Sequence, residues 1–458
     1  MTNKTGLNVS GTGEVGATVM LYLDGVAVGQ GTVNADGIWD IQVILSKDGD
    51  YTLTTTITDA AGNTLSSDPF LFTLDSKTDY PTIKLDDASN SGSLSDTITN
   101  DNTPSFHGTA EAGATVSILV NEVVVATVTA DAQGQWTWQY PATFADGEYS
   151  IRVIAEDAAG NTADSARMLL TVDTSTWIEV DKMTTDSGFY NNDYYTSKVI
   201  PTFQINGETG QPVDVYIDGK YVETITITGR NYLYTVPEAL GDGKHTIRFD
   251  ISDAAGNTAS TGERTFTIDT VNNTAVTLDT INGESIADHT VNDTIYINDL
   301  SAGVKFSGTA EENSYVTVTI NGMTVSQVWA NDQGGWSVNI NSLLLSDSNW
   351  NVKVTSQDKA GNSTSSTFSI VVDTSISQFT ANVQDDKDSS IDKWTVNSRT
   401  PTFNGVGEAG ATVTLLVAGM VVATTTVAAD GTWSITTDQL SEGNNALTFK
   451  IEDPAGNT

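Results

Sequence analysis

Acidic residues recur at matching positions along this chain of 458 residues, and carboxylates of this kind can transfer protons or bind hard cations. The plainest marker is the hexapeptide Asp-Ala-Ala-Gly-Asn-Thr, which starts at Asp59, Asp157 and Asp253 and returns with one or two changes at Asp358 and Asp453. The starting Asp residues are 95 to 105 positions apart, which is the length of one small domain. The spacing predicts a tandem array in which each copy carries acidic residues at fixed places.

These acidic positions fit metal binding better than catalysis. Each set combines the linker before a copy, tight turns within the copy, and the hexapeptide. Oxygen ligands without His or Cys suit a hard cation, and Ca²⁺ accepts six to eight oxygens, whereas Mg²⁺ prefers a tighter octahedron. The candidate ligands are Asp75, Glu111, Asp131 and Asp157 in the second copy; Asp173, Glu208 and Asp253 in the third; Asp269, Glu311, Asp332 and Asp358 in the fourth; and Asp373, Glu408, Asp430 and Asp453 in the fifth. The third copy has Gly229-Arg230-Asn231 in place of the acidic turn, so its site is expected to be weaker or altered.

Capping of turns is the alternative for any single Asp in this set. The full constellation favours calcium, because three or four clustered carboxylates repel one another strongly without a cation. A second, weaker candidate is the long polar loop of each copy, which is equally consistent with a solvated acidic loop. Its acidic residues are Asp86, Asp96 and Asp101 with Asp146 in the second copy, and Asp385, Asp386, Asp388 and Asp392 in the last.

Short strands must position these residues. In the second copy, alternating apolar segments predict strands at 82–85, 105–109, 115–120, 123–129, 136–140, 149–155 and 167–172, with a loop at 86–102. Seven short strands separated by turns are typical of an all-β, immunoglobulin-like sandwich. In that topology the turns with Glu111, Asp131 and Asp157 lie at the end of the sandwich that receives the linker with Asp75.

The array is predicted to contain five immunoglobulin-like modules, at 1–75, 76–174, 175–270, 271–374 and 375–458. The first module is expected to lack its first strand and the last its final strand. We therefore expect a piece of a longer repeat protein whose partners include neighbouring modules; a polymer joined by donated strands is the alternative. The linkers are short and lack Gly/Ser-rich spacers, which argues against a freely jointed chain.

Composition restricts the function further. The net charge of −38 disfavours nucleic acid and anionic membranes as partners. With no Cys in the sequence, disulfides and thiolate metal sites are excluded, and bound metal is the usual substitute in an extracellular domain. No apolar stretch approaches the ~20 residues of a membrane span, and residues 1–13 are too polar for a signal peptide.

The other conspicuous residues favour structural roles over catalytic ones. Trp39, Trp136, Trp336 and Trp433, and likewise Phe106, Phe203, Phe306 and Phe403, are expected in module cores. The histidines, His107, His245 and His289, form no recurring pair that would indicate a catalytic triad, so we predict that the chain is not an enzyme. The aromatic loop from Tyr190 to Tyr195 is present in one module only and is the best local candidate for a glycan or protein ligand.

Three motifs of the second copy carry a resemblance to a known family. They are Thr-Pro-Ser-Phe-x-Gly-Thr-Ala-Glu-Ala-Gly-Ala-x-Val from Thr103, Asp-x-x-Gly-x-Trp from Asp131, and the hexapeptide from Asp157. Together they resemble the bacterial Ig-like repeats of giant, type I-secreted, non-fimbrial adhesins of the SiiE and biofilm-associated kinds. The resemblance implies a rod on the bacterial cell surface, outside the cell, stiffened by Ca²⁺ between and within domains. It also implies a secretion signal beyond this segment and a role in adhesion or biofilm formation.

Residues and resemblance together predict a calcium-stiffened stalk segment that acts as a rigid spacer. The alternative is a glycan- or partner-binding region, with host-cell or matrix glycans held by module loops. The missing Asp of the third copy leaves its metal occupancy open.

Overall fold

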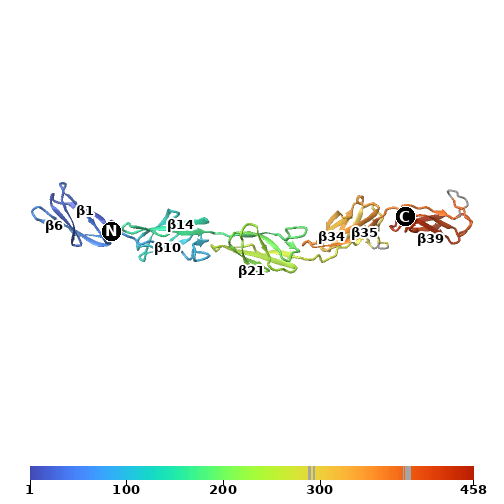
Figure 1. Cartoon of the computed structure of the whole chain (residues 1–458), viewed down its shortest axis with the longest axis horizontal. Coiled ribbons are helices and arrows are strands. Elements are labelled where there is room, and N and C mark those ends of the chain that lie inside the picture. Colours follow the sequence, from blue (N-terminus) through green and yellow to red (C-terminus); the bar gives the residue numbers. More distant parts are fainter. Residues whose placement is uncertain (287–289, 292–293, 385, 387–392) are drawn as a thin grey trace. The chain divides into compact units, whose positions relative to one another are not determined.

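The computed structural model describes residues 1–286, 290–291, 294–384, 386 and 393–458 (Figure 1). They divide into two compact units: Met1–Glu179 with Asn206–Tyr232 and Arg248–Gly262, and Val180–Ile205 with Leu233–Ile247 and Glu263–Thr458. Strands form nearly all of the regular structure, beside short 3-10 turns such as η2 (Ser342–Leu344). Within the described residues, no helix has the length and apolar character needed to cross a membrane.

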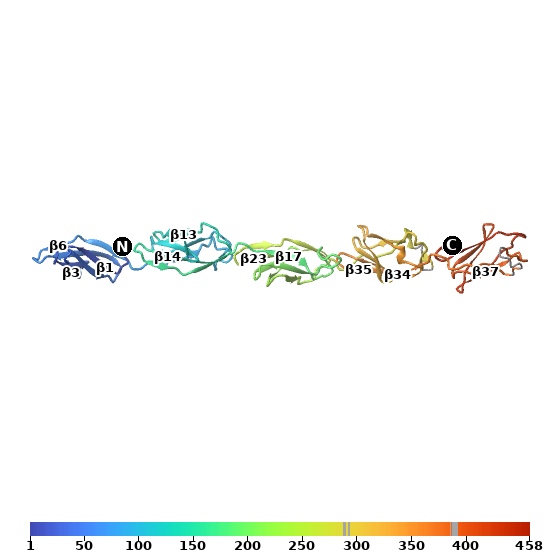
Figure 2. The same ribbon diagram turned by 90° about the horizontal axis from the view of Figure 1, so that it is seen from above.

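The second module, in the first unit, is a sandwich of two sheets (Figure 2). One sheet has the order β13-β10-β8 and the other the order β12-β11-β14-β16-β9, with β15 also paired to β14. The strands are β8 (Lys84–Leu85), β9 (Ile98–Thr99), β10 (Ser105–Thr109), β11 (Thr115–Val120), β12 (Val123–Thr129), β13 (Gln135–Gln139), β14 (Gly147–Glu156), β15 (Thr162–Asp164) and β16 (Met168–Val172). The prediction of all-β, immunoglobulin-like sandwiches is confirmed.

One strand of this module lies where a loop was predicted. Strand β9 pairs in parallel with β16, Ile98 opposite Thr171 and Thr99 opposite Val172. Two residues are too few to show an alternating pattern, and their partners follow some 70 positions later in the chain. The pairing holds the end of the long loop against the last strand of the module.

The first module repeats this arrangement with the strands β1 (Gly6–Thr12), β2 (Thr18–Leu23), β3 (Val26–Thr32), β4 (Ile38–Ile44), β5 (Gly49–Thr58), β6 (Thr64–Ser66) and β7 (Phe70–Leu74). Strand β1 pairs with β4, while β2, β3, β5, β6 and β7 form the other sheet. Thr2 makes a parallel bridge to Leu74, as Thr99 does to Val172 in the second module. A short piece of the first strand is therefore present where none was predicted.

The third module contributes to both units. Its strands are β17 (Ile178–Met183), β18 (Tyr195–Thr196), β19 (Thr202–Gly207), β20 (Pro212–Ile217), β21 (Lys220–Thr226), β22 (Tyr232–Thr235), β23 (Gly243–Ser252), β24 (Thr258–Ser260) and β25 (Arg264–Ile268). In the first unit, β20 pairs with β21, and the end of β23 pairs with β24. In the second unit, the start of β23 pairs with β25, which also takes β18 in parallel.

The fourth and fifth modules lie in the second unit. The fourth has β26 (Thr280–Ile281), β27 (Glu284–Ser285), β28 (Thr290–Val291), β29 (Thr294–Ile297), β30 (Val304–Thr309), β31 (Tyr315–Ile320), β32 (Met323–Trp329), β33 (Gly335–Ile340), β34 (Ser348–Gln357) and β35 (Ser363–Val372). The fifth has β36 (Asn382–Val383), β37 (Thr402–Val406), β38 (Thr412–Val417), β39 (Met420–Thr426), β40 (Thr432–Thr436) and β41 (Leu447–Glu452).

The recurrent aromatic residues form module cores, as predicted. Trp39, Trp136, Trp336 and Trp433 are all buried, and so are Phe106, Phe203, Phe306 and Phe403. The glycine two residues after Phe106 explains why these types recur together: a β-carbon on Gly108 would lie 2.7 Å from the Trp136 ring and 1.9 Å from the Thr82 carbonyl oxygen. The tryptophan therefore covers a strand that can approach it only at a glycine.

Candidate metal sites at the module junctions

The hexapeptide closes a turn through its own Asp and Asn. In the second module, the backbone N–H groups of Ala159 and Asn161 donate to Asp157 Oδ1 at 2.8 and 2.9 Å. The Asn161 side chain donates to Asp157 Oδ2 at 2.7 Å. Gly160 takes a φ of 87°, which a glycine adopts without strain. Short polar side chains that bond to their own turn backbone thus determine this local structure.

The same Asn also binds the linker that precedes its module. Asn161 Nδ2 donates to the backbone oxygen of Asp75 at 2.8 Å. Equivalent bonds join Asn257 to Asp173, Asn362 to Asp269 and Asn457 to Asp373, at 2.8 to 2.9 Å. This role was not predicted from the sequence, although the Asn is present in all five hexapeptides. The turn thereby places the linker Asp beside the hexapeptide Asp.

Each junction brings three carboxylates together. Within each group, one oxygen per residue lies within 4.8 Å of an oxygen of both other residues. The groups are Asp75, Glu111 and Asp157 at the first junction; Asp173, Glu208 and Asp253 at the second; Asp269, Glu311 and Asp358 at the third; and Asp373, Glu408 and Asp453 at the fourth. Each group combines a linker, the turn after the strand equivalent to β10, and a hexapeptide.

Burial and mutual repulsion act against the charges of these groups. Burial raises the pKa of Asp173, as does repulsion from Asp253 and Glu208. The pKa of Asp373 is raised in the same way, by burial and by Asp453 and Glu408. In a third group, burial raises the pKa of both Glu311 and Asp358, and the charge of Asp269 adds to each shift. The folded chain thus favours either a proton or a cation at these sites.

Hydrogen bonds reverse this tendency at the first junction. Although burial opposes ionisation of Asp157, the bonds from Asn161, Ala159 and Gly160 outweigh it and lower the pKa of Asp157. A carboxylate that is already ionised is a ready metal ligand. The geometry of the group is shared with the other junctions, but the pKa of its Asp157 is shifted in the direction opposite to that of Asp358.

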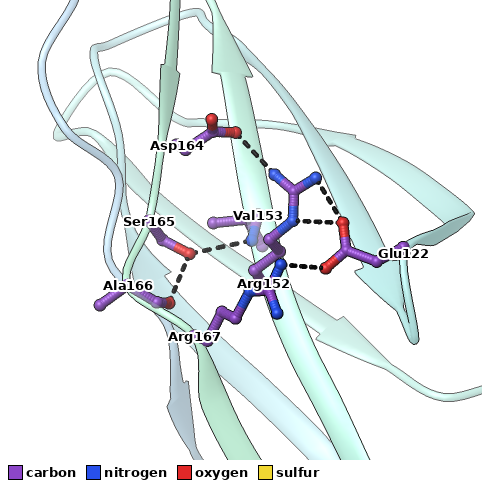
Figure 3. A network of polar contacts seen from close by, with 7 residues as sticks. All are labelled: Glu122, Arg152, Val153, Asp164, Ser165, Ala166 and Arg167. Atoms are coloured by element: carbon purple, nitrogen blue, oxygen red, sulfur yellow. Dashed lines mark hydrogen bonds and ion pairs between the residues drawn. The ribbon is translucent and has the colours of Figure 1, made fainter.

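A network on the second module shows how other acidic residues are neutralised (Figure 3). Arg152 lies between Glu122 and Asp164, with nitrogen–oxygen distances of 2.7 Å to each. Arg167 adds a second contact to Glu122 at 2.9 Å. Hydrogen bonding to Arg152 lowers the pKa of Glu122. Across the described residues, no ion pair involves a carboxylate of the junction groups, so no basic side chain neutralises those charges there.

Three of the predicted ligands lie outside these groups. Asp131 Oδ1 accepts the backbone N–H groups of Gln133 and Gln135, both at 2.8 Å, so its short side chain caps its own turn. Asp430 caps the equivalent turn through the N–H of Thr432 at 3.0 Å. In the fourth module the cap is Asn331, which leaves the neighbouring Asp332 exposed. The groups therefore contain three carboxylates, and the lack of Asp at 229–231 does not distinguish the third module.

The second candidate site is divided among separate turns. Asp101 accepts bonds from Ser89 and Thr103, and Asp96 from the N–H of Ile98. Asp86 contacts His107, while Asp146 accepts bonds from Thr174. In the portion of the chain that the structure describes, these carboxylates form no common group. Of the equivalent residues in the last module, Asp385, Asp388 and Asp392 lie outside the described residues, and Asp386 accepts the N–H of Thr395.

The aromatic loop of the third module contacts other parts of its own unit. The ring of Tyr190 stacks on Trp329 with centroids 5.9 Å apart and an interplanar angle of 3°. Phe189 approaches Tyr315 to 4.4 Å. The charged group of Lys359 lies 5.4 Å from the ring of Tyr195. The loop that was the best candidate for an external ligand therefore makes several internal contacts.

Comparison with known families agrees with the fold. Residues 77–174, 177–270, 275–374 and 375–458 each match the family described as bacterial Ig-like domain, and residues 1–75 match the one described as bacterial Ig domain. The chain belongs to the bacterial Ig-like domain family. This confirms the predicted resemblance to bacterial Ig-like repeats, and these families are structural repeats, not enzyme families. The module boundaries predicted from sequence stay a prediction.

Solved structures similar to this bacterial Ig-like repeat region include adhesin segments. A tetra-tandem repeat from the extending region of a large adhesion protein is 22% identical, with 80% of this chain and 95% of that chain covered and a TM-score of 0.28. A Ca²⁺-stabilized adhesin that helps an Antarctic bacterium bind ice is 30% identical, with 81% and 95% covered and a TM-score of 0.27. No curated protein matches the chain.

Proposed function

We propose that this chain is a calcium-stiffened spacer segment of a bacterial surface adhesin, located outside the cell. Four groups of three carboxylates, each shared between a linker and the module that follows, are the observation that carries the proposal. The same group of three carboxylates recurs at all four junctions, so one cation-binding chemistry could act along the whole segment. Its activity is mechanical: a cation at each group would restrict the bending of the linker.

The donor set fits Ca²⁺. Three carboxylates offer up to six oxygens of the hard type that Ca²⁺ prefers, and water or backbone oxygens can complete its shell. The three negative charges repel one another, as the raised pKa values of Asp173 and Asp373 indicate, and a divalent cation would remove that cost. When bound, calcium would supply charge neutralisation and a bridge between modules. In the cation's absence, Asn161 and its equivalents would still hold the linker backbone.

The bacterial surface and the adhesive role are inferred from family membership. The adhesin of the Antarctic bacterium is described as Ca²⁺-stabilized, and we extend that property to this chain because its own carboxylates are suitably grouped. Binding of glycans by the loop from Tyr190 to Tyr195 is the alternative prediction. Since the contacts of Tyr190 and Tyr195 are with Trp329 and Lys359 of the same chain, they add no support to it.

Calcium counting with a matched pair of variants tests the proposal. We expect calorimetry and metal analysis of the chelator-treated, calcium-reloaded chain to give four ions per molecule, one for each group. Glu111→Gln should remove one ion, since the hexapeptide turn is left intact. Glu14 is the matched control because it occupies the same turn in the first module, where Ala17 N–H donates to Glu14 O as Ala114 N–H does to Glu111 O. Glu14→Gln should retain all four ions.

Two results would contradict the proposal. One is a reloaded chain that holds no calcium in excess of the buffer. The other is equal scattering profiles and equal protease sensitivity with calcium and with chelator, because a joint that calcium stiffens must become more flexible without it. Retention of β-structure in chelator is expected, since the module cores do not include the carboxylates.

A further inference from the structure

The third residue of the hexapeptide differs in exposure from copy to copy. Ala61 of the first module is exposed, and Ala159 and Ala455 are partly exposed. Ala255 and Ala360 are both completely buried, with 0% exposure. The turn is the same in each copy, so something outside it covers the alanine in the third and fourth modules only.

A Ser-Gly dipeptide in the loop of the preceding module covers these two alanines. The Ser91 hydroxyl donates to the backbone oxygen of Ala255 and accepts the N–H of Asn100 from its own loop at 2.7 Å. At the next junction, the Ser187 hydroxyl donates to the backbone oxygen of Ala360 and accepts the N–H of Ser197 at 3.0 Å. Each serine is thus held by its own module while it bonds to the next.

The glycine of each dipeptide makes a backbone-to-backbone contact that no other residue permits. A β-carbon on Gly92 would lie 2.2 Å from the Ala254 carbonyl oxygen, and one on Gly256 would lie 2.8 Å from Gly92 N. In the same way, a β-carbon on Gly188 would lie 2.0 Å from the Lys359 carbonyl oxygen, and one on Gly361 2.9 Å from Gly188 N. Glycine at both positions allows the two turns to touch along their main chains.

The two other junctions make a different contact. There the glycine of the hexapeptide faces an asparagine amide: a β-carbon on Gly160 would lie 3.6 Å from Asn3 Nδ2, and one on Gly456 would lie 3.2 Å from Asn298 Nδ2. The loop of the fourth module has no Ser-Gly sequence between 282 and 298. The dipeptide at 91–92 recurs at 187–188, in the corresponding loop of the third module.

We propose that Ser91-Gly92 and Ser187-Gly188 are docking elements for the hexapeptide turn of the following module, and that they hold the second and third junctions without a cation. The contact consists of a hydrogen bond between neutral groups and close packing of main chains, so chelation does not remove it. At the third junction, the residues after Gly188 extend the contact through Phe189 on Tyr315 and Tyr190 on Trp329. Among the described residues, the first and fourth junctions show no Ser-Gly contact, so beyond the bond from the hexapeptide Asn to the linker backbone they rely on their carboxylate groups.

Distance measurements in chelator test this proposal independently of calcium binding. The chain has no Cys, so pairs of introduced cysteines can carry spin labels without background labelling. Five exposed residues begin the equivalent strand of each module and give matched label sites: Val26, Val123, Lys220, Met323 and Met420. Leu233 is an exposed residue of the third module that lies in the same unit as Met323. We expect narrow distance distributions for the pairs 123/220 and 233/323, and broad distributions for 26/123 and 323/420. Four distributions of equal width in chelator would overturn the proposal.

A substitution at the buried alanine separates docking from folding. Ala255→Gln should broaden the 123/220 distribution in chelator to the width of 26/123, because the longer side chain cannot fit beneath the loop. The same change at Ala61 is the matched control, since that position is exposed and tolerates a large side chain within the module. Ala360→Gln should act in the same way on 233/323. An Ala255→Gln chain that keeps a narrow 123/220 distribution would contradict the docking role, whatever its calcium content.

Discussion

The hexapeptides that begin at Asp59 and Asp358 fold into the same turn but have opposite electrostatic properties. In both, the Asn at the fifth position donates from its backbone and its side chain to the Asp. Those bonds lower the pKa of Asp59, which is in the first module. In the fourth module, burial raises the pKa of Asp358, and repulsion from Asp269 adds to the shift. The turn is therefore a local property of the sequence, whereas the acidic site exists only where a preceding linker contributes.

Substitution of the hexapeptide Asn should have the largest effect. It should distinguish the formation of the turn from the binding of the linker. Asn161 donates its side-chain N–H groups to Asp157 and to the backbone of Asp75, while Asn63 donates to Asp59. We expect Asn161→Ala to cost the second module about 2 kcal/mol, at roughly 1 kcal/mol per hydrogen bond lost, and Asn63→Ala to cost the first module less, because it removes one bond to an exposed carboxylate. Hydrogen exchange of the full chain, compared turn by turn, measures both. Equal costs would show that the bond to the linker contributes no stability.

The strands and the ends at which their turns lie were predicted well from the sequence. Strands β10, β11 and β12 have the predicted bounds because each alternates and ends at a clear turn. The convergence of Asp75, Glu111 and Asp157 followed from sandwich topology. Asp131 was assigned to the same group because topology places a turn at one end of a sandwich but does not determine where a short side chain points. Asp131 instead accepts hydrogen bonds from the backbone N–H groups of Gln133 and Gln135. These local bonds compete with a position in the carboxylate group.

Contacts between modules were the hardest to predict. Nothing in the periodicity of the long loop marks Ser91-Gly92, because its partner Ala255 is 164 positions away. The only available signal was the return of Ser-Gly at 187–188, at a spacing close to that of the hexapeptides. The loop from Tyr190 to Tyr195 was predicted to bind an external ligand, and its contacts within the chain were missed for a similar reason. Exposed aromatic residues in a loop do not show from sequence whether their partner is external or in the same chain.

An acidic pair within one module offers a second contrast with the junction groups. Burial raises the pKa of Asp186 to about 6, and the nearby charge of Asp193 adds to the shift. The second module has Asn90 before Ser91 where the third has Asp186 before Ser187. We expect Asp186→Asn to stabilise the third module at pH 7 by about 1 kcal/mol. A shift of two pKa units corresponds to nearly 3 kcal/mol, but the half-buried carboxylate is screened by solvent.

The pH dependence of the stabilisation expected for Asp186→Asn provides its control. Because the folded state holds the Asp186 proton more tightly than the unfolded state, the cost is fully present above pH 6 and disappears below the unfolded value of 3.8. Asp186→Asn should therefore gain stability at pH 7 and none at pH 3.5. Hydrogen exchange around 183–197, measured in chelator, compares the two conditions. A variant that is less stable than the parent at pH 7 would show that Asp186 makes a favourable contact as an anion.

The smallest expected effect is the pH dependence of protection from hydrogen exchange in the two hexapeptide turns, measured in cation-free solution. Asp358 has a raised pKa, so protection of its turn should decrease as pH rises from 3.8 through the folded-state pKa. Asp59 has a lowered pKa, so protection of its turn should decrease in the opposite direction, as pH falls below 3.8 through the folded-state pKa. Both shifts are smaller than that of Asp186, and so are the expected total changes in protection. Added calcium should restore the protection of the Asp358 turn at pH values above its folded-state pKa and leave Asp59 unchanged, because a bound cation replaces the proton only where a linker completes the group. If both turns respond to pH in the same direction, the junction does not alter the chemistry of the hexapeptide.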